Sequence, residues 1–207
     1  MQHLDYSQQD SWRQSDDTPL QSPIAINTTT TQSTKESDLA LTFDGQTVYD
    51  DRVVGEQFLV TGELKISGET WDLERIHFHD GAEHVIDGVR HDLEIHFVYR
   101  QGERILVLAV LGDVTDKSID THIQEIFTKP IDAKLIADWL PEKHSYYRYV
   151  GSLTTPPLGP KVIWIVLSEP IVVSAADLAV IHERYPNNHR DIQDISDRDV
   201  LSVHVEK

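Results

Sequence analysis

Short runs in which hydrophobic and polar residues alternate recur along most of this chain. In residues 92–99, hydrophobic side chains at the odd positions alternate with Asp92, Glu94, His96 and Val98 at the even positions. A period of two places one face of a β-strand in a core and leaves the other face for polar groups. Similar runs, separated by Gly, Asp and Asn at short intervals, predict an antiparallel sheet.

The same pattern predicts where the individual elements lie. We expect strands at residues 39–43, 57–60, 63–66, 70–78, 146–149, 162–167 and 200–205. Residues 104–111 form a continuous apolar run that ends at Gly112, which predicts a central buried strand. Helical spacing occurs at 119–127, 134–139 and 175–185, and Ser174 is a suitable N-cap for the last of these. Residues 1–23 lack periodicity. The β-branched run at 28–37 predicts a strand end followed by a loop.

Length and composition narrow the class of protein. The 207 residues predict one domain, 1–207, large enough to bury a substantial core. Lysine and arginine number 18 against 35 aspartate and glutamate, a net charge of −17, which disfavours nucleic acid and anionic membranes as partners. No apolar run is long enough to span a bilayer.

The cysteine count and the start of the chain bear on location. There is no cysteine, so a disulfide framework and a thiol-ligated metal are both excluded. The first ten residues are polar and do not have the apolar core of a signal peptide. We therefore expect a cytoplasmic protein. A secreted or periplasmic protein is the alternative if a signal was removed from a longer precursor.

Three histidines are the strongest chemical signal. His77 and His79 are two residues apart, so on a strand they share one face at a spacing of ~6.7 Å. His96 and Glu94 share a face of the 92–99 run. Two adjacent strands would then present three imidazoles to one point, as in catalytic zinc sites that keep a fourth position open. Glu94 is placed to accept the other ring N–H of a ligand histidine.

Two other interpretations of these residues stay open at this point. A pair of histidines two apart on an amphipathic strand is more often a solvated polar face than a ligand pair. Cupin barrels also use such a pair followed by glutamate. Cupins require glycine near position 71, where this chain has Trp71, and a later element with Gly, Pro and His that this chain lacks.

A series of longer motifs extends the histidine pattern in both directions. They are Q-S-P-I at 21–24, H-F-H-x3-E-H at 77–84, E-I-H at 94–96, A-V-L-G at 109–112, G-S-L-T-T-P-P-L at 151–158, W-I-V-L at 164–167 and N-x-R at 188–190. In these residues the chain resembles α-class carbonic anhydrases of the bacterial type, from about Tyr6 to Arg190. The resemblance implies a mainly β fold: one domain with a large, twisted, mostly antiparallel sheet and short peripheral helices.

The resemblance also implies an activity, a cofactor and site residues. The activity would be zinc-dependent, reversible hydration of carbon dioxide to bicarbonate and a proton. Zinc would lower the pKa of its bound water to about 7, an effect for which this enzyme class is itself the standard example. His77, His79 and His96 resemble the zinc ligands. Glu83 and Thr154 resemble the pair that orients the attacking oxygen.

Other residues acquire supporting roles by the same resemblance. Val98, Val110, Leu153, Val162 and Trp164 resemble the apolar wall for carbon dioxide, with Thr155 at its rim. Asn188 and Arg190, with Glu94, would support the ligands from behind. Tyr6 and His3 would lie at the mouth, and the bonds before Pro23 and Pro157 would be cis.

The sequence departs from the family at two places. Arg75 stands where the family has glutamine as an acceptor for the first ligand, and a guanidinium only donates hydrogen bonds. No histidine lies between His3 and His77, so the usual imidazole that relays protons is missing. His3 is then the only histidine expected near the mouth, and Glu56 is expected to be an exposed carboxylate at its rim.

Three functions and two assembly states are consistent with the sequence. The first is hydration of carbon dioxide. The second is a catalytically silent module of the same family, and the third is a cupin-type metal enzyme. The expected partners are carbon dioxide and bicarbonate, and the expected assembly is a monomer or a homodimer.

Overall fold

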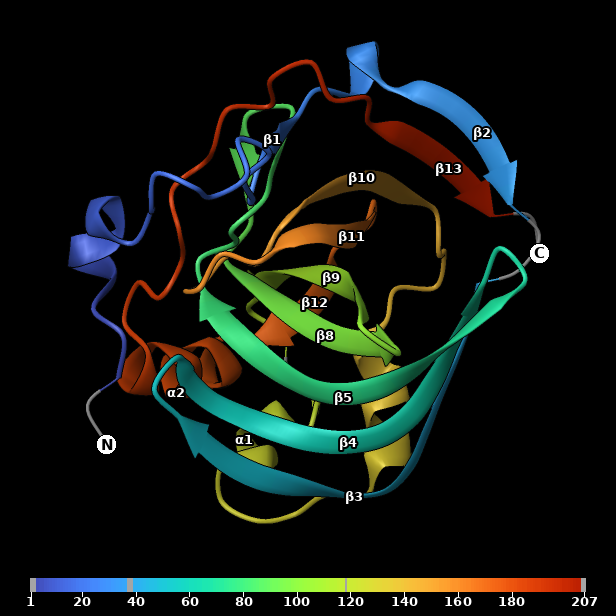
Figure 1. The fold of residues 1–207 in the computed structure, drawn as a ribbon. Coiled ribbons are helices and arrows are strands. Elements are labelled where there is room, and N and C mark those ends of the chain that lie inside the picture. Colours follow the sequence, from blue (N-terminus) through green and yellow to red (C-terminus); the bar gives the residue numbers. More distant parts are fainter. Residues whose placement is uncertain (1–2, 37–38, 118, 206–207) are drawn as a thin grey trace.

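One large sheet dominates the fold (Figure 1), described here for residues 3–36, 39–117 and 119–205 of a computed structural model. The described part of this sheet has ten strands, in the order β2-β13-β10-β11-β9-β8-β5-β4-β3, with β12 paired to β9. The strands are β2 (Gln32–Glu36), β3 (Leu39–Arg52), β4 (Gly55–Ile66), β5 (Glu69–Asp80), β8 (Leu93–Gln101), β9 (Arg104–Thr115), β10 (Tyr146–Ser152), β11 (Pro160–Leu167), β12 (Ile171–Ser174) and β13 (Leu201–Val205).

The pairing of the strands confirms the expected sheet and adds parallel pairs to it. Six pairs, including the run from β3 through β4, β5 and β8 to β9, are antiparallel. The pairs β11–β9, β12–β9 and β13–β2 are parallel. A small separate sheet contains β1 (Ala25–Ile26), β6 (Val85–Ile86) and β7 (Val89–Arg90).

The helices are short and lie at the periphery of the sheet, as expected (Figure 1). They are α1 (Ile123–Ile126), α2 (Ala175–Arg184) and the 3₁₀ helices η1 (Tyr6–Ser11), η2 (Thr28–Thr30) and η3 (Ala133–Trp139). Ser174 caps α2 in a reciprocal capping box with Asp177, which confirms the expected start of that helix.

Three local predictions are wrong in extent or order. In residues 28–36 the 3₁₀ helix η2 comes first and the strand β2 follows it, whereas a strand end followed by a loop was expected. The helix expected at 119–127 covers only α1, because His122 adopts a left-handed φ of 59° and therefore cannot continue a right-handed helix. The expected strands 57–60 and 63–66 form the single strand β4, interrupted by a register shift between Leu59 and Glu63. Position 62 in this strand requires glycine, because a Cβ there would lie 2.2 Å from the carbonyl oxygen of Thr42.

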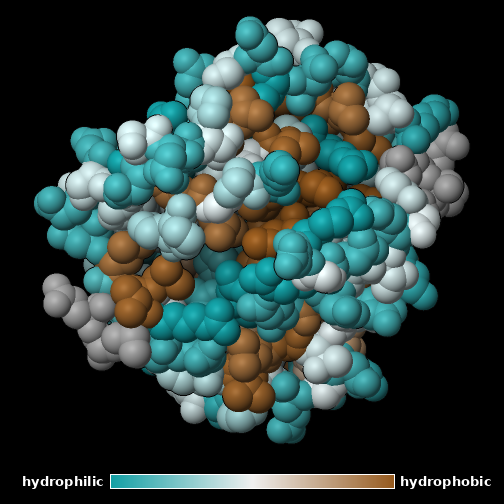
Figure 2. Space-filling view, in the orientation of Figure 1, coloured by the Kyte–Doolittle hydropathy of each residue, from teal (hydrophilic) through white to brown (hydrophobic). Residues whose placement is uncertain are grey.

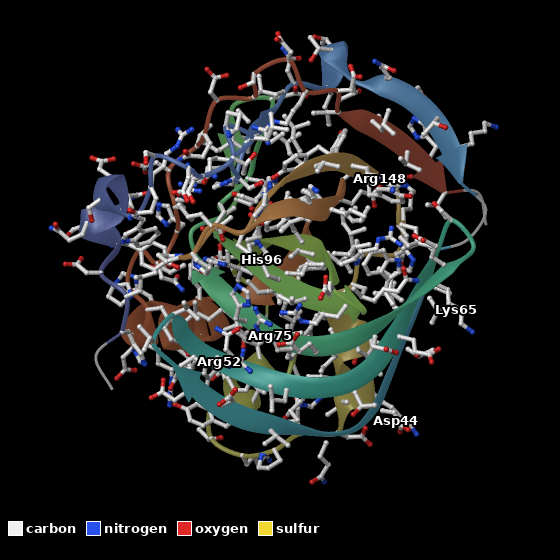
Figure 3. All side chains as sticks on the ribbon, viewed as in Figure 1. Asp44, Arg52, Lys65, Arg75, His96 and Arg148 are labelled. Atoms are coloured by element: carbon white, nitrogen blue, oxygen red, sulfur yellow. The ribbon has the colours of Figure 1, made fainter. Side chains whose placement is uncertain are left out.

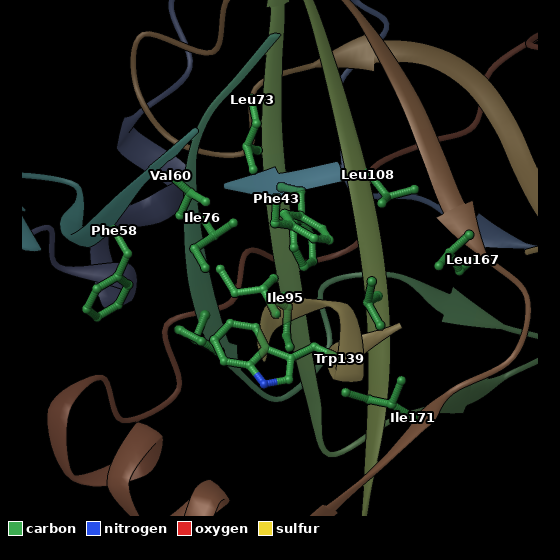
Figure 4. Close-up of a cluster of buried hydrophobic side chains, with 14 of the residues drawn as sticks. Phe43, Phe58, Val60, Leu73, Ile76, Ile95, Leu108, Trp139, Leu167 and Ile171 are labelled. Carbon is green, nitrogen blue, oxygen red and sulfur yellow. The ribbon is translucent and has the colours of Figure 1, made fainter. Parts of the chain in front are cut away.

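Hydrophobic side chains form a separate cluster on each face of the sheet. The larger cluster (Figure 4) includes Phe43, Ile95 and Leu108 from the sheet and Trp139 from η3. The smaller cluster contains Ile24, Val98, Val107, Tyr149, Val162 and Trp164, among others. In β8 every residue from Leu93 to Tyr99 is buried, so this strand lies at the centre of the molecule and its polar residues are shielded from bulk water.

The face of the molecule seen in Figure 1 has hydrophobic surface at its centre, surrounded by hydrophilic side chains (Figure 2). Among the described residues, no helix has both the length and the apolar character needed to cross a membrane.

Candidate metal centre

His77, His79 and His96 come together at the middle of the sheet. His77 and His79 lie on β5, and His96 lies directly opposite His77 on the antiparallel neighbour β8. Nε2 of His79 is 3.1 Å from Nδ1 of His96, and this same Nδ1 is 3.2 Å from Nε2 of His77. The structure therefore brings the three expected ligand nitrogens to one point.

The outer nitrogens of two of these rings fix which atoms face the centre. Nδ1 of His79 lies 2.6 Å from the backbone carbonyl of Asn188, which only accepts hydrogen bonds, so this nitrogen carries the proton. Nε2 of His96 lies 2.6 Å from the carboxylate of Glu94 and donates to it. In the neutral rings, the inward nitrogens then carry bare lone pairs only 3.1 Å apart. Two lone pairs repel at this distance unless a cation lies between them.

The third ring has no such partner. Nδ1 of His77 is buried without a hydrogen bond from any described residue. This agrees with the presence of Arg75, whose guanidinium donates to Gln57 and Glu74 and offers no acceptor. Burial, the two neighbouring rings and Arg75 all lower the pKa of His77 well below its ordinary value. The ring is therefore neutral near pH 7, which is the form that binds metals.

The donor set fits zinc. Three imidazole nitrogens without thiolate or bidentate carboxylate match a catalytic site that holds Zn²⁺ through three histidines. Burial also lowers the pKa of His79, against the opposing charge of Glu83, so this second ligand is neutral as well. The lowered pKa values of His77 and His79 keep these two rings in the form that binds a metal, and the short distance between the inward nitrogens of His79 and His96 favours a cation between them.

Glu94 holds two histidines at once. Its Oε1 accepts from Nε2 of His96 and from Nδ1 of His84, at 2.6 and 2.7 Å, and its Oε2 accepts from the backbone N–H of His84. Burial raises the pKa of this carboxyl, but the two histidines outweigh burial and hold it well below its usual range. Glu94 therefore stays ionised and fixes the orientation of His96, as expected from the sequence.

A buried polar chain behind Glu94 was missed in the sequence. Nε2 of His84 lies 2.7 Å from the hydroxyl of Tyr149, which is 3.0 Å from Oγ of Ser22. Gly151 makes room for this chain, because a Cβ there would lie 2.1 Å from Oγ of Ser22. In the sequence, the only local indication of this polar chain was that His84 directly follows Glu83.

Glu83 has one carboxylate oxygen without a hydrogen-bond partner among the described residues, and Thr154 is not hydrogen-bonded to it. Oε1 of Glu83 accepts the backbone N–H of Arg190 at 2.8 Å, whereas Oε2 is buried without a hydrogen bond from the described residues. Thr154 is 5 % exposed in the loop between β10 and β11, and its hydroxyl makes no hydrogen bond to Glu83 here. One carboxylate oxygen is thus left free to accept.

Asn188 and Arg190 support the centre from the C-terminal segment. The side chain of Asn188 accepts from the backbone of Asp80 at 2.7 Å and donates to the carbonyl of Phe78 at 2.9 Å, so it pairs with β5 on both sides of His79. The guanidinium of Arg190 donates to Gln21 and to the carbonyl of Ser22. Asn188 therefore contacts the strand that carries His79, and Arg190 contacts Glu83 and the segment at Gln21 and Ser22, while their role in supporting the centre stays a prediction.

Most of the expected apolar wall lies on the face of the sheet that carries the three histidines. Val98, Val162 and Trp164 belong to the smaller cluster, Leu153 packs against it, and the Trp164 ring centroid is 5.0 Å from that of His96. All four therefore lie on the histidine face, and Trp164 is in ring contact with His96.

Val110 is an exception and its assignment is wrong. It pairs with Ile95 and lies in the larger cluster on the opposite face of the sheet. Val107 pairs with Val98 and occupies the face that Val110 was expected to occupy. A shift of three residues in matching the motif reverses the face, because alternate strand residues point to opposite sides.

Tyr6 and Thr155 line a cavity together with His77 and His79. Burial and the nearby Glu83 raise the pKa of the Tyr6 hydroxyl, so Tyr6 stays protonated. A larger cavity of about 520 Å³ adjoins this one through shared residues, and His3 lines it. Tyr6 and His3 therefore line the larger cavity, and Thr155 lines the inner one.

Two expectations about the mouth are wrong. His189 also lines the larger cavity, so His3 is not the only histidine there. Glu56 lines the inner cavity but is only 7 % exposed, because it is held by Tyr49, Arg184 and Tyr185. It is a fixed, buried carboxylate and not a mobile one at the rim.

Comparison with known proteins places the chain in a family. Residues 7–204 match the family described as eukaryotic-type carbonic anhydrase. A carbonic anhydrase from Nostoc is 33% identical over 156 residues, which cover 68% of this chain and 57% of that protein. The chain belongs to the eukaryotic-type carbonic anhydrase family. A carbonic anhydrase from Pectobacterium carotovorum is 32% identical over 67% of this chain and 61% of its own length.

Solved carbonic anhydrases share the fold. The α-carbonic anhydrase of Photobacterium profundum superposes with a TM-score of 0.80 and 30% identity, covering 93% of this chain and 94% of that one. The α-carbonic anhydrase of Thermovibrio ammonificans, solved with the inhibitor sulfanilamide, gives 0.78 and 28%, covering 89% of this chain and 87% of that one. This chain spans about three fifths of the curated relatives' lengths, 57% and 61%. Family membership excludes the cupin alternative, and the bonds before Pro23 and Pro157 are cis, as expected.

Proposed function

We propose that this carbonic anhydrase homologue catalyses the reversible hydration of carbon dioxide to bicarbonate and a proton, with zinc held by His77, His79 and His96. The observation that carries the proposal is the pair of bare lone pairs, on Nε2 of His79 and Nδ1 of His96, at 3.1 Å. Bound zinc would supply Lewis acidity, which makes a water molecule acidic enough to yield a nucleophile near neutral pH. Family membership supports this chemistry.

Glu83 and Thr154 would orient the nucleophile. Because Oε1 of Glu83 is taken by the backbone of Arg190, only Oε2 is free to accept the hydroxyl proton of Thr154. A threonine hydroxyl that donates its one proton in this way can only accept from a further group. Thr154 would therefore hold the nucleophile with a lone pair directed at the substrate, which lowers the entropic part of the barrier.

The apolar residues next to the centre suit a substrate without charge or net dipole. Val98, Val107, Val162 and Trp164 cluster on the histidine face and offer no hydrogen bond toward it except the indole N–H, which donates to the carbonyl of Ser152. Such a surface accepts carbon dioxide and disfavours ordered water. Leu153 and Thr155 would complete the wall and its rim.

The alternative is a catalytically silent member of the family. The intact donor set and the ionised Glu94 behind it support catalysis, since loss of a metal ligand is the simplest route to a silent protein. Stopped-flow measurement of carbon dioxide hydration, before and after removal of metal by a chelator, tests the proposal. Hydration that disappears with the metal and returns with added zinc is expected. Zinc-loaded protein that hydrates no carbon dioxide would identify the silent module.

Assembly and location stay predictions. We propose a monomer or homodimer in the cytoplasm, without nucleic-acid or membrane partners. The absence of cysteine and the net charge of −17 support this. Light scattering of the purified protein and fractionation of the producing cells test it.

A further inference from the structure

Arg75 lies on the same face of the sheet as the candidate metal ligands. It is two residues before His77 on β5, so both side chains point to the same side of the strand. Its partner across the sheet is Val98, next to the His77–His96 pair. The side chain lines the cavity that His77, His79 and Thr155 also line. Figure 3 shows Arg75 between His96 and Arg52 on this face.

The guanidinium of Arg75 has donors to spare. Nε donates to Oε1 of Gln57 at 2.9 Å, and Nη1 donates to Oε1 of Glu74 at 2.6 Å. Nη2 has no hydrogen bond with any residue in the described ranges, and the side chain is only 14 % exposed. A guanidinium carries five N–H groups, so the two on Nη2 need acceptors from outside the protein.

The charges around Arg75 do not cancel. Arg52, Arg75 and Arg100 all face Glu74, with Arg75 at 2.6 Å, Arg52 at 3.8 Å and Arg100 in direct contact. Asp50 pairs with Arg52 at 2.7 Å, which leaves three cations against two carboxylates. A local excess of positive charge therefore borders the cavity in a chain whose net charge is −17.

The acidic residue that lines this cavity, Glu56, does not remove the excess. Glu56 forms an ion pair with Arg184 at 2.7 Å and accepts the hydroxyls of Tyr49 and Tyr185. Its charge is thus matched by a cation of its own. Among the described residues, the carboxylate paired with Arg75 is Glu74, which does not line the cavity and is shared with Arg52 and Arg100.

These observations fit a small anion as the missing partner. A planar guanidinium pairs well with planar oxyanions through parallel N–H groups. We propose that Arg75 and the His77–His79–His96 centre together form a binding site for a small planar oxyanion. The identity of the natural ligand as bicarbonate rests on the proposed function. Arg75 would then bind the product after it forms and slow its release.

Nitrate is the probe for this site, because it is planar, anionic and inert. Its dissociation constant is measured by absorption titration of protein in which cobalt(II) replaces zinc. We expect Arg75→Gln to raise the constant by about tenfold, the usual size of one lost charge-assisted hydrogen bond, and Arg75→Lys to raise it less. The matched control is Arg100→Gln, which also loses contact with Glu74 but does not line the cavity. Equal nitrate affinity in wild type and Arg75→Gln would overturn the proposal.

A second variant, with the opposite expected effect on nitrate affinity, keeps the test valid if Arg75→Gln does not fold. Glu74→Gln removes the carboxylate that neutralises Arg75, so nitrate should bind more tightly. Unchanged or weaker binding in this variant counts against the site. In the zinc protein, nitrate should also shift the NMR signal of the Arg75 Nε–H, and the absence of a shift means that the anion does not reach this residue.

The two proposals fail in different ways. Fast carbon dioxide hydration with no effect of Arg75 on nitrate leaves the proposed function standing and removes the anion site. Nitrate binding that depends on Arg75 in a protein that hydrates no carbon dioxide keeps the anion site and removes bicarbonate as its ligand.

Discussion

The carboxylate of Glu94 accepts a hydrogen bond from Nε2 of His96, two residues further along the same strand, at 2.6 Å. Because this carboxylate stays ionised and also binds His84, it holds the His96 ring in one tautomer with Nδ1 facing the centre. Glu94 therefore fixes the orientation of His96 without facing the centre itself. Variants of Glu94 test the effect of ligand orientation while all three ligand nitrogens are kept.

Glu94→Gln should weaken zinc binding by about ten- to a hundredfold, the usual cost of losing a group that orients a ligand. The shape of the side chain is kept, but its charge and half of its acceptor capacity are lost. Competition with a fluorescent zinc chelator measures the change. Glu103→Gln, on the exposed turn after β8, is the control and should not change the affinity. An unaltered constant for Glu94→Gln would show that His96 needs no such support.

Single ligand variants should lose the metal. His77→Ala, His79→Ala or His96→Ala each leaves two of the three nitrogens, so zinc content after dialysis should fall well below about one per chain and hydration should nearly vanish. Elemental analysis and stopped-flow assays give both numbers. His204→Ala, on the exposed part of β13, is the matched control. Full zinc content and activity in any ligand variant would refute the ligand set.

The two valines of β9 should respond differently to truncation. Val110→Ala opens a cavity in the larger core and should lower the free energy of unfolding by about 1–2 kcal/mol without changing kcat/KM. Val107→Ala lies on the histidine face and should change kcat/KM as well. Urea denaturation and stopped-flow kinetics on both variants decide the matter. If Val110→Ala alone altered kcat/KM, the assignment of the two faces would be reversed.

Proton release should depend on buffer. Glu56 is fixed by three partners, and His189 is bonded through Nδ1 to the carbonyl of Asp80, so neither is a mobile relay at the inner cavity. His3 lies at the mouth but is paired with Asp51 at 2.6 Å. Imidazole has a pKa near the working pH, so the maximal hydration rate should rise strongly with imidazole buffer.

His3→Ala tests the remaining internal route. At low buffer concentration, its maximal rate should fall further if His3 relays protons, and imidazole should restore it. The turnover number at saturating carbon dioxide is followed across a buffer series at constant ionic strength. A high rate that does not change with buffer would reveal an efficient internal relay and contradict this prediction.

Tyr49 should titrate unusually late. Its hydroxyl donates to Oε1 of Glu56, and this hydrogen bond, followed by burial and nearby carboxylates, raises the pKa of Tyr49 to about 12 from 10.0. A raised pKa favours the protonated form in the fold. This contribution to stability is therefore complete below pH 10 and is lost as the pH rises through 12.

Phenolate absorbance measures the titration of Tyr49 directly. The difference between wild type and Tyr49→Phe should show a step close to pH 12, and Glu56→Gln should return that step toward 10. A step that is near 10 in the wild type would mean that Glu56 does not accept from this hydroxyl in solution.

The histidine triad could be predicted because its geometry is local. Two-residue spacing fixes the face for His77 and His79, and one antiparallel neighbour supplies His96. Helix α2 could be predicted for a similar reason, since Ser174 and Asp177 cap it within one turn. Sequence reasoning works where the deciding contact is a few residues away or follows from simple strand pairing.

Other features depend on contacts that local patterns do not contain. The run L-V-L-A-V-L at 106–111 can be matched to the family motif in two registers. Only the pairing of Val107 with Val98 decides which of its valines lies on the histidine face. The acceptor for His79 is the backbone carbonyl of Asn188, 109 residues away, and a carbonyl leaves no trace in side-chain identity. The burial of Glu56 follows likewise from Arg184 and Tyr185, at the C-terminal end of the distant helix α2.

The link between His79 and Asn188 has a consequence for the order of events on the ribosome. The three histidines are synthesised well before Asn188 and Arg190, which bind His79 and Glu83. Asn188 follows His79 by 109 residues, and Arg190 follows Glu83 by 107 residues. A nascent chain that ends before Asn188 would hold the imidazoles without the carbonyl that fixes one of them. Tight metal uptake should therefore follow the synthesis of Asn188 and Arg190 and the exit of both residues from the ribosome.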